Sequence, residues 1–316
     1  MNTLRIQTLN FKCVITQDML FHDFLGNTIR GILGNALIRH YCLHEDFDRN
    51  NEAPPCEQCP YNGSIPMYST GCVYADCFKS IHKSVRMPSV PNPFVIKVGY
   101  GHPRLYEKGE SIRFSILLFG KAVEWTDDVT RCMEDAVLLK HPLVTIRQES
   151  TQELLWSDTF DSSKPTTAQV KSNSKDHSVD NVKSHISEHY RNDQLDLNFR
   201  TPLQIWKGKR LVKYPEFNVF MDTLFARIAA LIDVYETEPF TLPYDLLIRK
   251  PHVHLELAED TWHKVQIRQA MQTFQGYCGK LRYSGDLRAY IPYLRLGELI
   301  HVGKLTTRGF GEYQLA

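Results

Sequence analysis

Near the C-terminus, three glycines alternate with cations. Gly303, Gly309 and Gly311 stand close to Lys304 and Arg308. Small residues let a backbone approach a phosphate group, and cations supply the opposite charge. The same spacing also fits a glycine turn ahead of a final strand, because a lone glycine-rich stretch is a weak motif. The segment is therefore a candidate site for a phosphate-bearing ligand, with a structural turn as the alternative.

A second basic segment, WKGKRLVK, holds the densest run of cations in the chain. Lys207, Lys209 and Arg210 follow a tryptophan within it. Basic and aromatic side chains together suit single-stranded nucleic acid. A charge run is equally typical of a solvated face, so both interpretations stay open here.

Five cysteines fall in one irregular segment, residues 41–92. Cys56 and Cys59 form a CxxC pair, the spacing with which two thiolates bind one metal ion. Four thiolates complete a tetrahedral zinc site or hold an iron–sulfur cluster, and in a zinc site they leave no open position for chemistry. Such a metal would therefore stabilise the segment. The other cysteines available as ligands are Cys42, Cys72 and Cys77.

Hydrophobic periodicity predicts the elements that position these residues. In the first half, the expected elements are residues 3–15, 25–40, 93–100, 111–120, 126–140 and a strand from 151. In the second half, they are 194–203, 215–236, 248–257, 274–283, 287–299 and 310–315. A shift of the apolar phase near Asn10 predicts a β-bulge. Pro292 predicts a break or a short start in the helix at 287–299.

Both halves thus show the order βαββαβ, which is the ferredoxin-like or RRM-like unit of α+β proteins. Two such units in tandem are often used on single-stranded RNA. We expect an N-terminal domain over 1–160 with the cysteine-rich insertion at 41–92. A polar linker or mobile loop should cover 161–193. A C-terminal domain with the glycine-rich loop should cover 194–316.

Composition bounds these expectations. The chain has 316 residues, 42% hydrophobic and 23% charged, and a formal net charge of +1. This length suggests two domains, and the charge requires any nucleic-acid-binding face to be local. With no apolar run of eighteen residues and no secretory leader, we expect a cytoplasmic protein with no membrane partner. Its eight cysteines then favour metal binding over disulfides. The chain lacks P-loop, GxSxG and Rossmann motifs.

Three segments resemble one family, the CRISPR precursor-RNA-processing endoribonucleases (the sixth Cas family, of the RAMP superfamily). The C-terminal GKLRYSGDLRAYIPYLRLGELIHVGKLTTRGFGEYQLA is similar to the family signature LGE-x-x-HVGK-x-T-x-x-G-x-G-x-Y. The first helix, GNTIRGILGNALIRHYC, looks like the N-terminal segment of one subgroup. FRTPLQIWKGKRL resembles the strand that opens the second domain. Arg308 departs from the pattern, which more often has an aromatic or apolar residue there, and it adds charge to the loop.

The resemblance implies metal-independent cleavage of CRISPR repeat RNA, as a step of antiviral defence that supplies guide RNA to other Cas proteins. The RNA 2′-hydroxyl would attack the neighbouring phosphate, helped by a general base and a general acid. The products would carry a 5′-hydroxyl and a 2′,3′-cyclic or 3′-phosphate. We expect the RNA to be held by Arg30, Lys207, Lys209, Arg210, His301, Gly303, Lys304, Arg308, Gly309 and Gly311.

The family's general base is usually a histidine in or near the first helix. His40, beside Tyr41 at the helix end, is the leading candidate, followed by His44 and His22. His40 can instead cap the helix, while His44 can be a further metal ligand or a surface residue and His22 a core residue. His301 is another candidate, whose alternative role is a hydrogen bond that orders the glycine-rich loop.

The subgroup's cysteine pattern selects Cys42, Cys56, Cys59 and Cys72 as ligands of a structural zinc and leaves Cys77 over. A rival set uses Cys77 in place of Cys42. Two other classes of function stay open. A non-catalytic RNA-binding RAMP subunit of a CRISPR effector complex would use the same fold and loop. A zinc-knuckle DNA-binding protein would leave the C-terminal signature unexplained.

Overall fold

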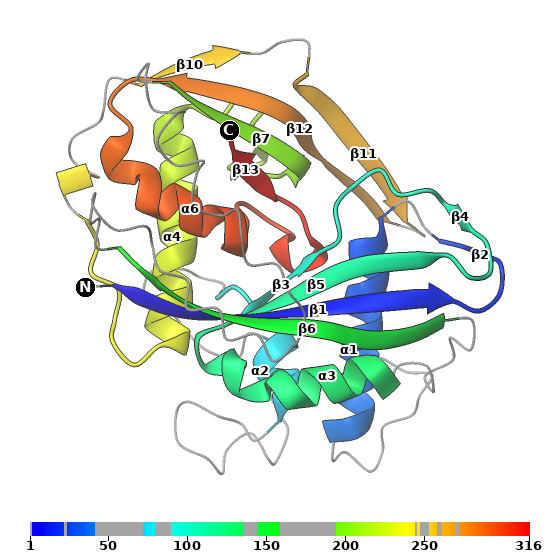
Figure 1. The fold of residues 1–316 in the computed structure, drawn as a ribbon. Helices are drawn as coiled ribbons and strands as arrows, with labels where there is room; N and C mark the ends of the chain where they lie inside the picture. The colour runs from blue at the N-terminus through cyan, green and yellow to red at the C-terminus, as the bar shows by residue number, and fades with distance from the viewer. Residues whose placement is uncertain are drawn as a thin grey trace, which may run out of the picture.

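The computed structural model forms two antiparallel sheets with helices between and beside them (Figure 1). It describes residues 2–21, 24–41, 72–79, 90–135, 144–158, 194–243, 245–246, 253–257, 261–269 and 272–316. The predicted linker at 161–193 lies outside these ranges, as does most of the predicted insertion at 41–92. Among the described residues, no helix is long and apolar enough to cross a membrane.

The first sheet has the strand order β3-β5-β1-β6. Its strands are β1 (Thr3–Ile15), β3 (Phe94–Lys97), β5 (Ser111–Phe119) and β6 (Val144–Ser157). The register of β1 against β6 shifts between Asn10 and Phe11, which confirms the predicted bulge. Buried and less buried residues alternate along β1, as expected for a strand with one face on a core.

Three helices cover one face of this sheet. They are α1 (Leu25–Tyr41), α2 (Val73–Phe78) and α3 (Thr126–Asp135), the last preceded by the 3₁₀ helix η3 (Gly120–Trp125). Leu33 and Leu37 of α1 pack with Ile116 and Leu118 of β5 in one buried cluster. In Figure 1, α1 runs from the neighbourhood of β11 past the first sheet to α3. The two ends of α1 therefore meet different parts of the molecule.

The second sheet repeats the arrangement with the order β10-β12-β7-β13. Its strands are β7 (Gln194–Leu203), β10 (His254–Leu257), β12 (Gln272–Ser284) and β13 (Tyr313–Leu315). A further strand, β11 (His263–Gln269), pairs with β12. Its helices are α4 (Phe217–Tyr235) and α6 (Ile291–Ile300), which follows the 3₁₀ turn η5 (Arg288–Tyr290). In both sheets the strands of the unit lie in the order second, third, first, fourth, so the predicted tandem ferredoxin-like fold is confirmed.

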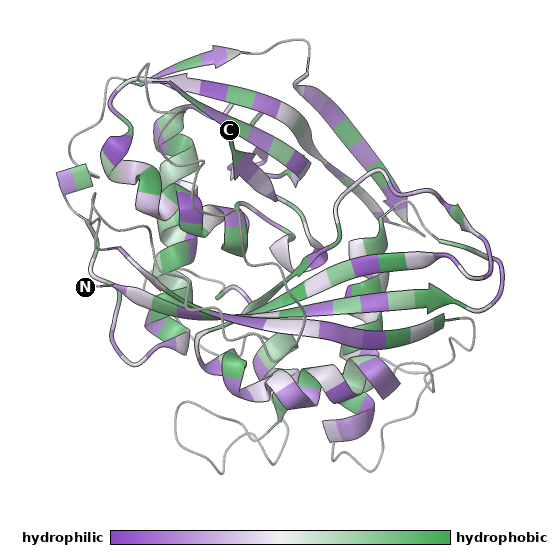
Figure 2. Ribbon diagram, in the orientation of Figure 1, coloured by the Kyte–Doolittle hydropathy of each residue, from purple (hydrophilic) through white to green (hydrophobic). Residues whose placement is uncertain are grey.

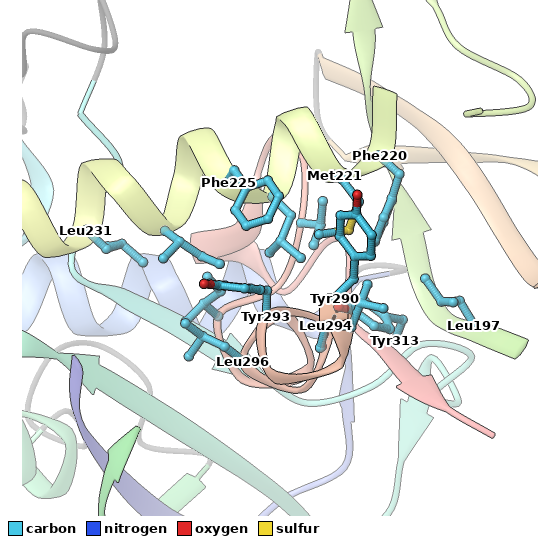
Figure 3. Close-up of a cluster of buried hydrophobic side chains, with 14 of the residues drawn as sticks. Leu197, Phe220, Met221, Phe225, Leu231, Tyr290, Tyr293, Leu294, Leu296 and Tyr313 are labelled. Carbon is cyan, nitrogen blue, oxygen red and sulfur yellow. Dashed lines mark hydrogen bonds between the residues drawn. The ribbon is translucent and has the colours of Figure 1, made fainter. Parts of the chain in front are cut away.

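The largest core lies around α4 and α6, and it uses residues of both sheets. Figure 3 shows Phe220, Met221 and Phe225 of α4 facing Tyr293 and Leu294 of α6. Leu4 and Ile6 of β1 and Leu117 of β5 belong to the same cluster. Apolar residues accordingly dominate α4 in Figure 2. The two sheets are thus joined through a shared apolar core.

Most predicted elements are present, with differences at their ends. Strand β6 begins at Val144 instead of 151, and β11 was not predicted. Pro292 lies in the first turn of α6, so the predicted short start is confirmed. The final strand begins only at Tyr313, because the preceding residues belong to the glycine-rich loop.

Short elements decorate the two sheets. Two are small hairpins, β2 (Met19–Leu20) with β4 (Leu105–Tyr106) and β8 (Trp206–Lys207) with β9 (Arg210–Leu211). One is the 3₁₀ turn η6 (Thr306–Arg308) within the glycine-rich loop.

Candidate functional site

The glycine-rich loop, residues 301–311, links α6 to β13. Its base is closed by a hydrogen bond from the backbone N–H of Val302 to the carbonyl of Gly311, at 3.1 Å. Five of its residues have positive φ: His301, Gly303, Leu305, Gly309 and Gly311. His301 and Leu305 are the two non-glycine residues with positive φ in the described part of the chain. Such backbone costs free energy for a residue with a side chain, so surrounding contacts must hold the loop in this shape.

The three predicted glycines bring protein backbone close to protein backbone. A Cβ on Gly303 would collide with the carbonyl of Gln204, and one on Gly311 with the carbonyl of Val302. A Cβ on Gly309 would lie 2.8 Å from the carbonyl oxygen of Ile96 in β3. Gly309 and Gly311 are also buried. The structural alternative named for this segment, a glycine turn ahead of the final strand, is therefore part of what these glycines do.

The loop docks on the N-terminal end of α1. A guanidinium N–H of Arg308 donates to the side-chain oxygen of Asn27 at 2.7 Å. Nε of Arg30 donates to the hydroxyl of Thr307 at 3.3 Å. A Cβ on Gly26 would collide with the carbonyl of Arg308, so only glycine permits this approach. These contacts bring the C-terminal signature and the first helix into one site.

Both arginines of this joint are partly buried and lie against aromatic rings. The guanidinium of Arg308 is 4.9 Å from the ring centre of Phe274, and that of Arg30 is 4.8 Å from that of Phe78. Burial lowers the pKa of both side chains, and for Arg30 the charge of Arg308 lowers it further. Lys304, by contrast, is exposed. Of the two predicted cations in the loop, Lys304 is thus the more accessible to a phosphate.

Gln204 connects the loop to the basic hairpin. Its carbonyl accepts the backbone N–H of Lys304 at 2.9 Å, and its side-chain amide donates to the carbonyl of Gln275 in β12 at 2.7 Å. Two residues later the chain enters the β8–β9 hairpin. The three predicted cations of that hairpin are all exposed: Lys207, Lys209 and Arg210.

A row of exposed side chains on β11 escaped the prediction. Lys264, Gln266 and Arg268 are exposed and alternate with the buried Val265 and Ile267. Trp262, just before the strand, donates from its indole to the carbonyl of Lys213 at 2.7 Å, which joins the start of β11 to the segment after β9.

Three adjoining segments contain no acidic residue, and this was readable in the sequence. They are residues 201–215, 261–280 and 299–311. The signal was missed because β11 itself was not recognised. Together the segments supply exposed cations to one part of the molecular surface, while Lys280 at the end of the second segment pairs with Asp196 of β7.

His301 lies beneath this surface and not on it. Its side chain is 0% exposed, and Nδ1 donates to the carbonyl of Phe310 at 3.1 Å. Burial lowers its pKa well below the ordinary value, and the nearby charges of Lys97 and Arg227 lower it further. A side chain without exposed surface has no contact to offer RNA in this conformation. The alternative role, ordering the loop, fits its position.

The leading catalytic candidate lies at the opposite end of α1. His40 is exposed, and its Nε2 is 3.6 Å from a carboxylate oxygen of Asp135 in α3. The hydroxyl of Tyr41 donates to Asp128 of α3, and burial and this bond raise the pKa of the phenol. Thirteen residues separate Asn27 from His40, which is about 20 Å along a helix. The glycine-rich loop and His40 therefore do not contact the same point.

Several predicted residues fall outside the described ranges: His22, His44, Cys42, Cys56 and Cys59. Cys72 immediately precedes α2, and Cys77 lies within it. The thiol of Cys72 lies 3.9 Å from the carbonyl of Tyr41, while Cys77 is buried and burial raises its pKa. Among the described residues no three metal-ligating side chains gather, but three of the five candidates are not among them.

A polar cleft of about 460 Å³ opens between the two sheets. Lys97 of β3 lies 3.5 Å from the carboxylate of Glu312, and Arg113 of β5 lies 3.0 Å from that of Glu149. Arg200 of β7 is exposed at its rim. The cleft adjoins the base of the glycine-rich loop through Glu312.

Residues 197–313 match the family model of the CRISPR-associated endoribonuclease Cas6. The chain carries a Cas6 endoribonuclease domain. This domain supports the predicted class of enzyme, an endoribonuclease that processes precursor CRISPR RNA. Residues 4–141 match a second family model, AF_1859_N, described as an N-terminal domain. No curated protein matches the chain.

Solved structures share the fold at low identity. A Cas6 product complex (TTHB231) is 13% identical with a TM-score of 0.54 and covers 98% of this chain and 100% of its own. Cas6 (TTHB231) of Thermus thermophilus is 12% identical with a TM-score of 0.52, covering 100% of each chain. A partial Cas6-RT-Cas1–Cas2 complex is 14% identical with a TM-score of 0.50 over 99% of this chain and 46% of that one. These likenesses extend the Cas6-type fold over both sheets.

Proposed function

We propose that this Cas6-type protein binds CRISPR repeat RNA on the surface formed by the glycine-rich loop, the β8–β9 hairpin and β11, and cuts it without a catalytic metal. The observation that carries the proposal is the joint between the loop and α1, made by Arg308 with Asn27 and by Arg30 with Thr307. This joint connects the cations of the Cas6 domain to α1, which carries His40 in its last turn.

The chemistry proposed is attack of the RNA 2′-hydroxyl on the adjacent phosphate. His40 would take the proton, and the carboxylate of Asp135 at 3.6 Å would orient the imidazole. Tyr41 is less suited to be a base, because its raised pKa keeps the phenol protonated. His22 and His44 stay alternative bases.

The distance between the two ends of α1 fits a strand of RNA laid along the helix. About 20 Å corresponds to roughly six stacked nucleotides at about 3.4 Å each. Phosphates held by Lys304 and the basic hairpin would thus lie several nucleotides from a cut at His40. If His22 is the base instead, binding and cutting would share one end of the helix, because His22 is two residues along the chain from Phe24, whose ring packs edge-on against Phe310 of the loop.

The test is cleavage of repeat RNA from the neighbouring CRISPR array by the purified protein in EDTA. We expect cutting that survives EDTA and stops when a single 2′-deoxy nucleotide stands at the cut. The product should carry a 5′-hydroxyl. Tight binding without cutting would instead identify a non-catalytic RNA-binding RAMP subunit, and cutting that needs added metal would reject the mechanism.

A structural zinc is proposed for Cys42, Cys56, Cys59 and Cys72. Supporting this set, Cys72 lies beside Tyr41, the neighbour of Cys42 in the chain, whereas Cys77 is enclosed in the core. Elemental analysis should find about one zinc per chain, with the loss of most of it in Cys72→Ser and its retention in Cys77→Ser. The opposite pattern would select the rival set, and iron with sulfide would indicate an iron–sulfur cluster.

A further inference from the structure

Three buried polar side chains underlie the glycine-rich loop. Arg227 of α4, His301 and Glu312 are 5%, 0% and 3% exposed. Within the described residues, four buried side-chain polar atoms have no hydrogen-bond partner, and three of them belong to this group: Arg227 Nη2, His301 Nε2 and Glu312 Oε2. Buried polar side chains are uncommon and are normally hydrogen-bonded, so three of them beneath one loop call for a structural explanation.

Two of these side chains hold the two ends of the loop. Nε of Arg227 donates to the carbonyl of Ile300, the residue before the loop, at 2.9 Å. Nδ1 of His301 donates to the carbonyl of Phe310, near its end, at 3.1 Å. Because Nδ1 donates to a carbonyl, it carries the proton, and Nε2 of the neutral ring is an acceptor. The two hydrogen bonds hold the carbonyls of Ile300 and Phe310, one at each end of the loop.

The third residue, Glu312, fastens the base of the loop to both sheets, through its side chain and its backbone. The carboxylate of Glu312 pairs with Lys97 of β3 at 3.5 Å. Its backbone N–H donates to the hydroxyl of Thr201 at 2.8 Å, and its carbonyl accepts the N–H of Arg200 at 2.9 Å. The loop base therefore has fixed partners in β3 and β7.

The backbone of the loop requires such support. His301 and Leu305 have φ of 59° and 63°, values that L residues adopt at a cost. Without the side-chain hydrogen bonds, the segment would relax toward ordinary backbone angles. Lys304 would then leave its exposed position, and Arg308 would lose its contact with α1.

We infer that Arg227 and His301 form a clamp that positions the glycine-rich loop for RNA binding. Both are positioning residues, because neither is exposed to RNA. The consequence for RNA rests on the proposed function, whereas the consequence for the loop itself does not. The two can therefore be tested separately.

The first test follows the loop in the protein without RNA. Limited trypsin digestion reports on the peptide bonds after Lys304 and Arg308, with the bonds after Lys207, Lys209 and Arg210 as internal references. In Arg227→Met, which removes the donors, we expect cleavage within the loop to rise about tenfold while the references stay unchanged. In Arg227→Gln, which keeps an amide donor, loop cleavage should lie between that of the original protein and that of Arg227→Met. Arg288→Met, at an exposed arginine outside the clamp, should behave as the original protein.

The second test separates positioning from general destabilisation. We expect Arg227→Met to weaken the Kd for repeat RNA by about tenfold, while the single-turnover cleavage rate at saturating protein changes less than about twofold. A merely structural role would lower the active fraction and leave the Kd of the folded molecules unchanged.

The outcomes of these two tests decide whether the clamp exists. Unchanged loop cleavage in a folded Arg227→Met protein overturns the clamp, as does a rise that the reference sites share. Should that variant not fold, His301→Phe removes the other donor and carries the same measurements. Selective loop cleavage in a protein that proves unable to cut RNA would leave the clamp standing and reject the proposed function.

Discussion

The two ends of α1 are built in opposite ways. At the N-terminal end, Gly26 and Asn27 are covered by a loop from the far end of the chain, with Asn27 and Arg308 281 residues apart. At the C-terminal end, Arg39 and His40 are exposed, and Nε2 of His40 lies 3.6 Å from the carboxylate of Asp135. One end is a packed joint and the other an open surface. Under the proposed function, RNA binding and chemistry would lie at opposite ends of one helix.

The largest expected effect tests which end carries the chemistry. His40→Ala should lower the single-turnover cleavage rate by about 10²–10⁴-fold, as for loss of a general base. Arg39→Ala, at the neighbouring exposed position, is the matched control and should keep most of the rate. A greater loss in His22→Ala than in His40→Ala would move the reaction to the loop end of the helix.

Two glycines of α1 test the packed joint. Gly26→Ala should weaken RNA binding by about tenfold and lower the melting temperature, because the added methyl displaces the carbonyl of Arg308. Gly31→Ala should raise stability by up to about 1 kcal/mol, since that position is exposed with no neighbour within 4 Å of a Cβ. If the two variants had the same melting temperature and the same RNA affinity, the close approach of the loop to Gly26 would be excluded.

A smaller effect tests the exposed cation of the loop. Lys304→Gln should weaken RNA binding several-fold and reduce the slope of log K against log salt by about 0.7. Lys108→Gln, at an exposed position in the turn before β5, should change neither quantity. A salt slope that Lys304→Gln leaves unaltered would exclude a phosphate contact at this position.

The smallest effect concerns the pH dependence of stability. The pKa of His301 is depressed in the folded protein, so the unfolded chain takes up a proton below about 6.5 that the folded chain does not. Stability should therefore fall as pH is lowered from 7 to 5, by at most about 1.4 kcal/mol per pH unit from this group. His301→Gln should show a flatter melting temperature over that range. A variant as pH-sensitive as the original protein would contradict the buried, neutral histidine.

The same comparison explains what the sequence could predict. Local patterns foretold the bulge near Asn10, the short start at Pro292 and the tandem fold. They also placed the cations of the hairpin on an exposed surface. Strand β11 was missed because Val265 and Ile267 supply only two apolar positions of alternation.

What local pattern did not contain is the meeting of distant segments. Nothing near Gly26 indicates that a carbonyl from residue 308 will rest on it, because that requirement arises only when α1 and the loop pack together. Likewise the low pKa of His301 depends in part on the charges of Lys97 and Arg227, which lie on other elements. The roles assigned to the catalytic histidines and to the cysteine set stay predictions, because most of these residues lie outside the described ranges.

The shared core has a consequence for how the chain is made. Leu4, Ile6 and Leu117 belong to a cluster completed by α4, so the first sheet is synthesised with one apolar face uncovered. Helix α4 is complete at Tyr235, 77 residues after Asp158 (235 − 158), which a ribosome adds in about 4–15 s at about 5–20 residues per second. During that interval the nascent first half exposes a surface that its own later segment must cover, and its solubility depends on the second half arriving.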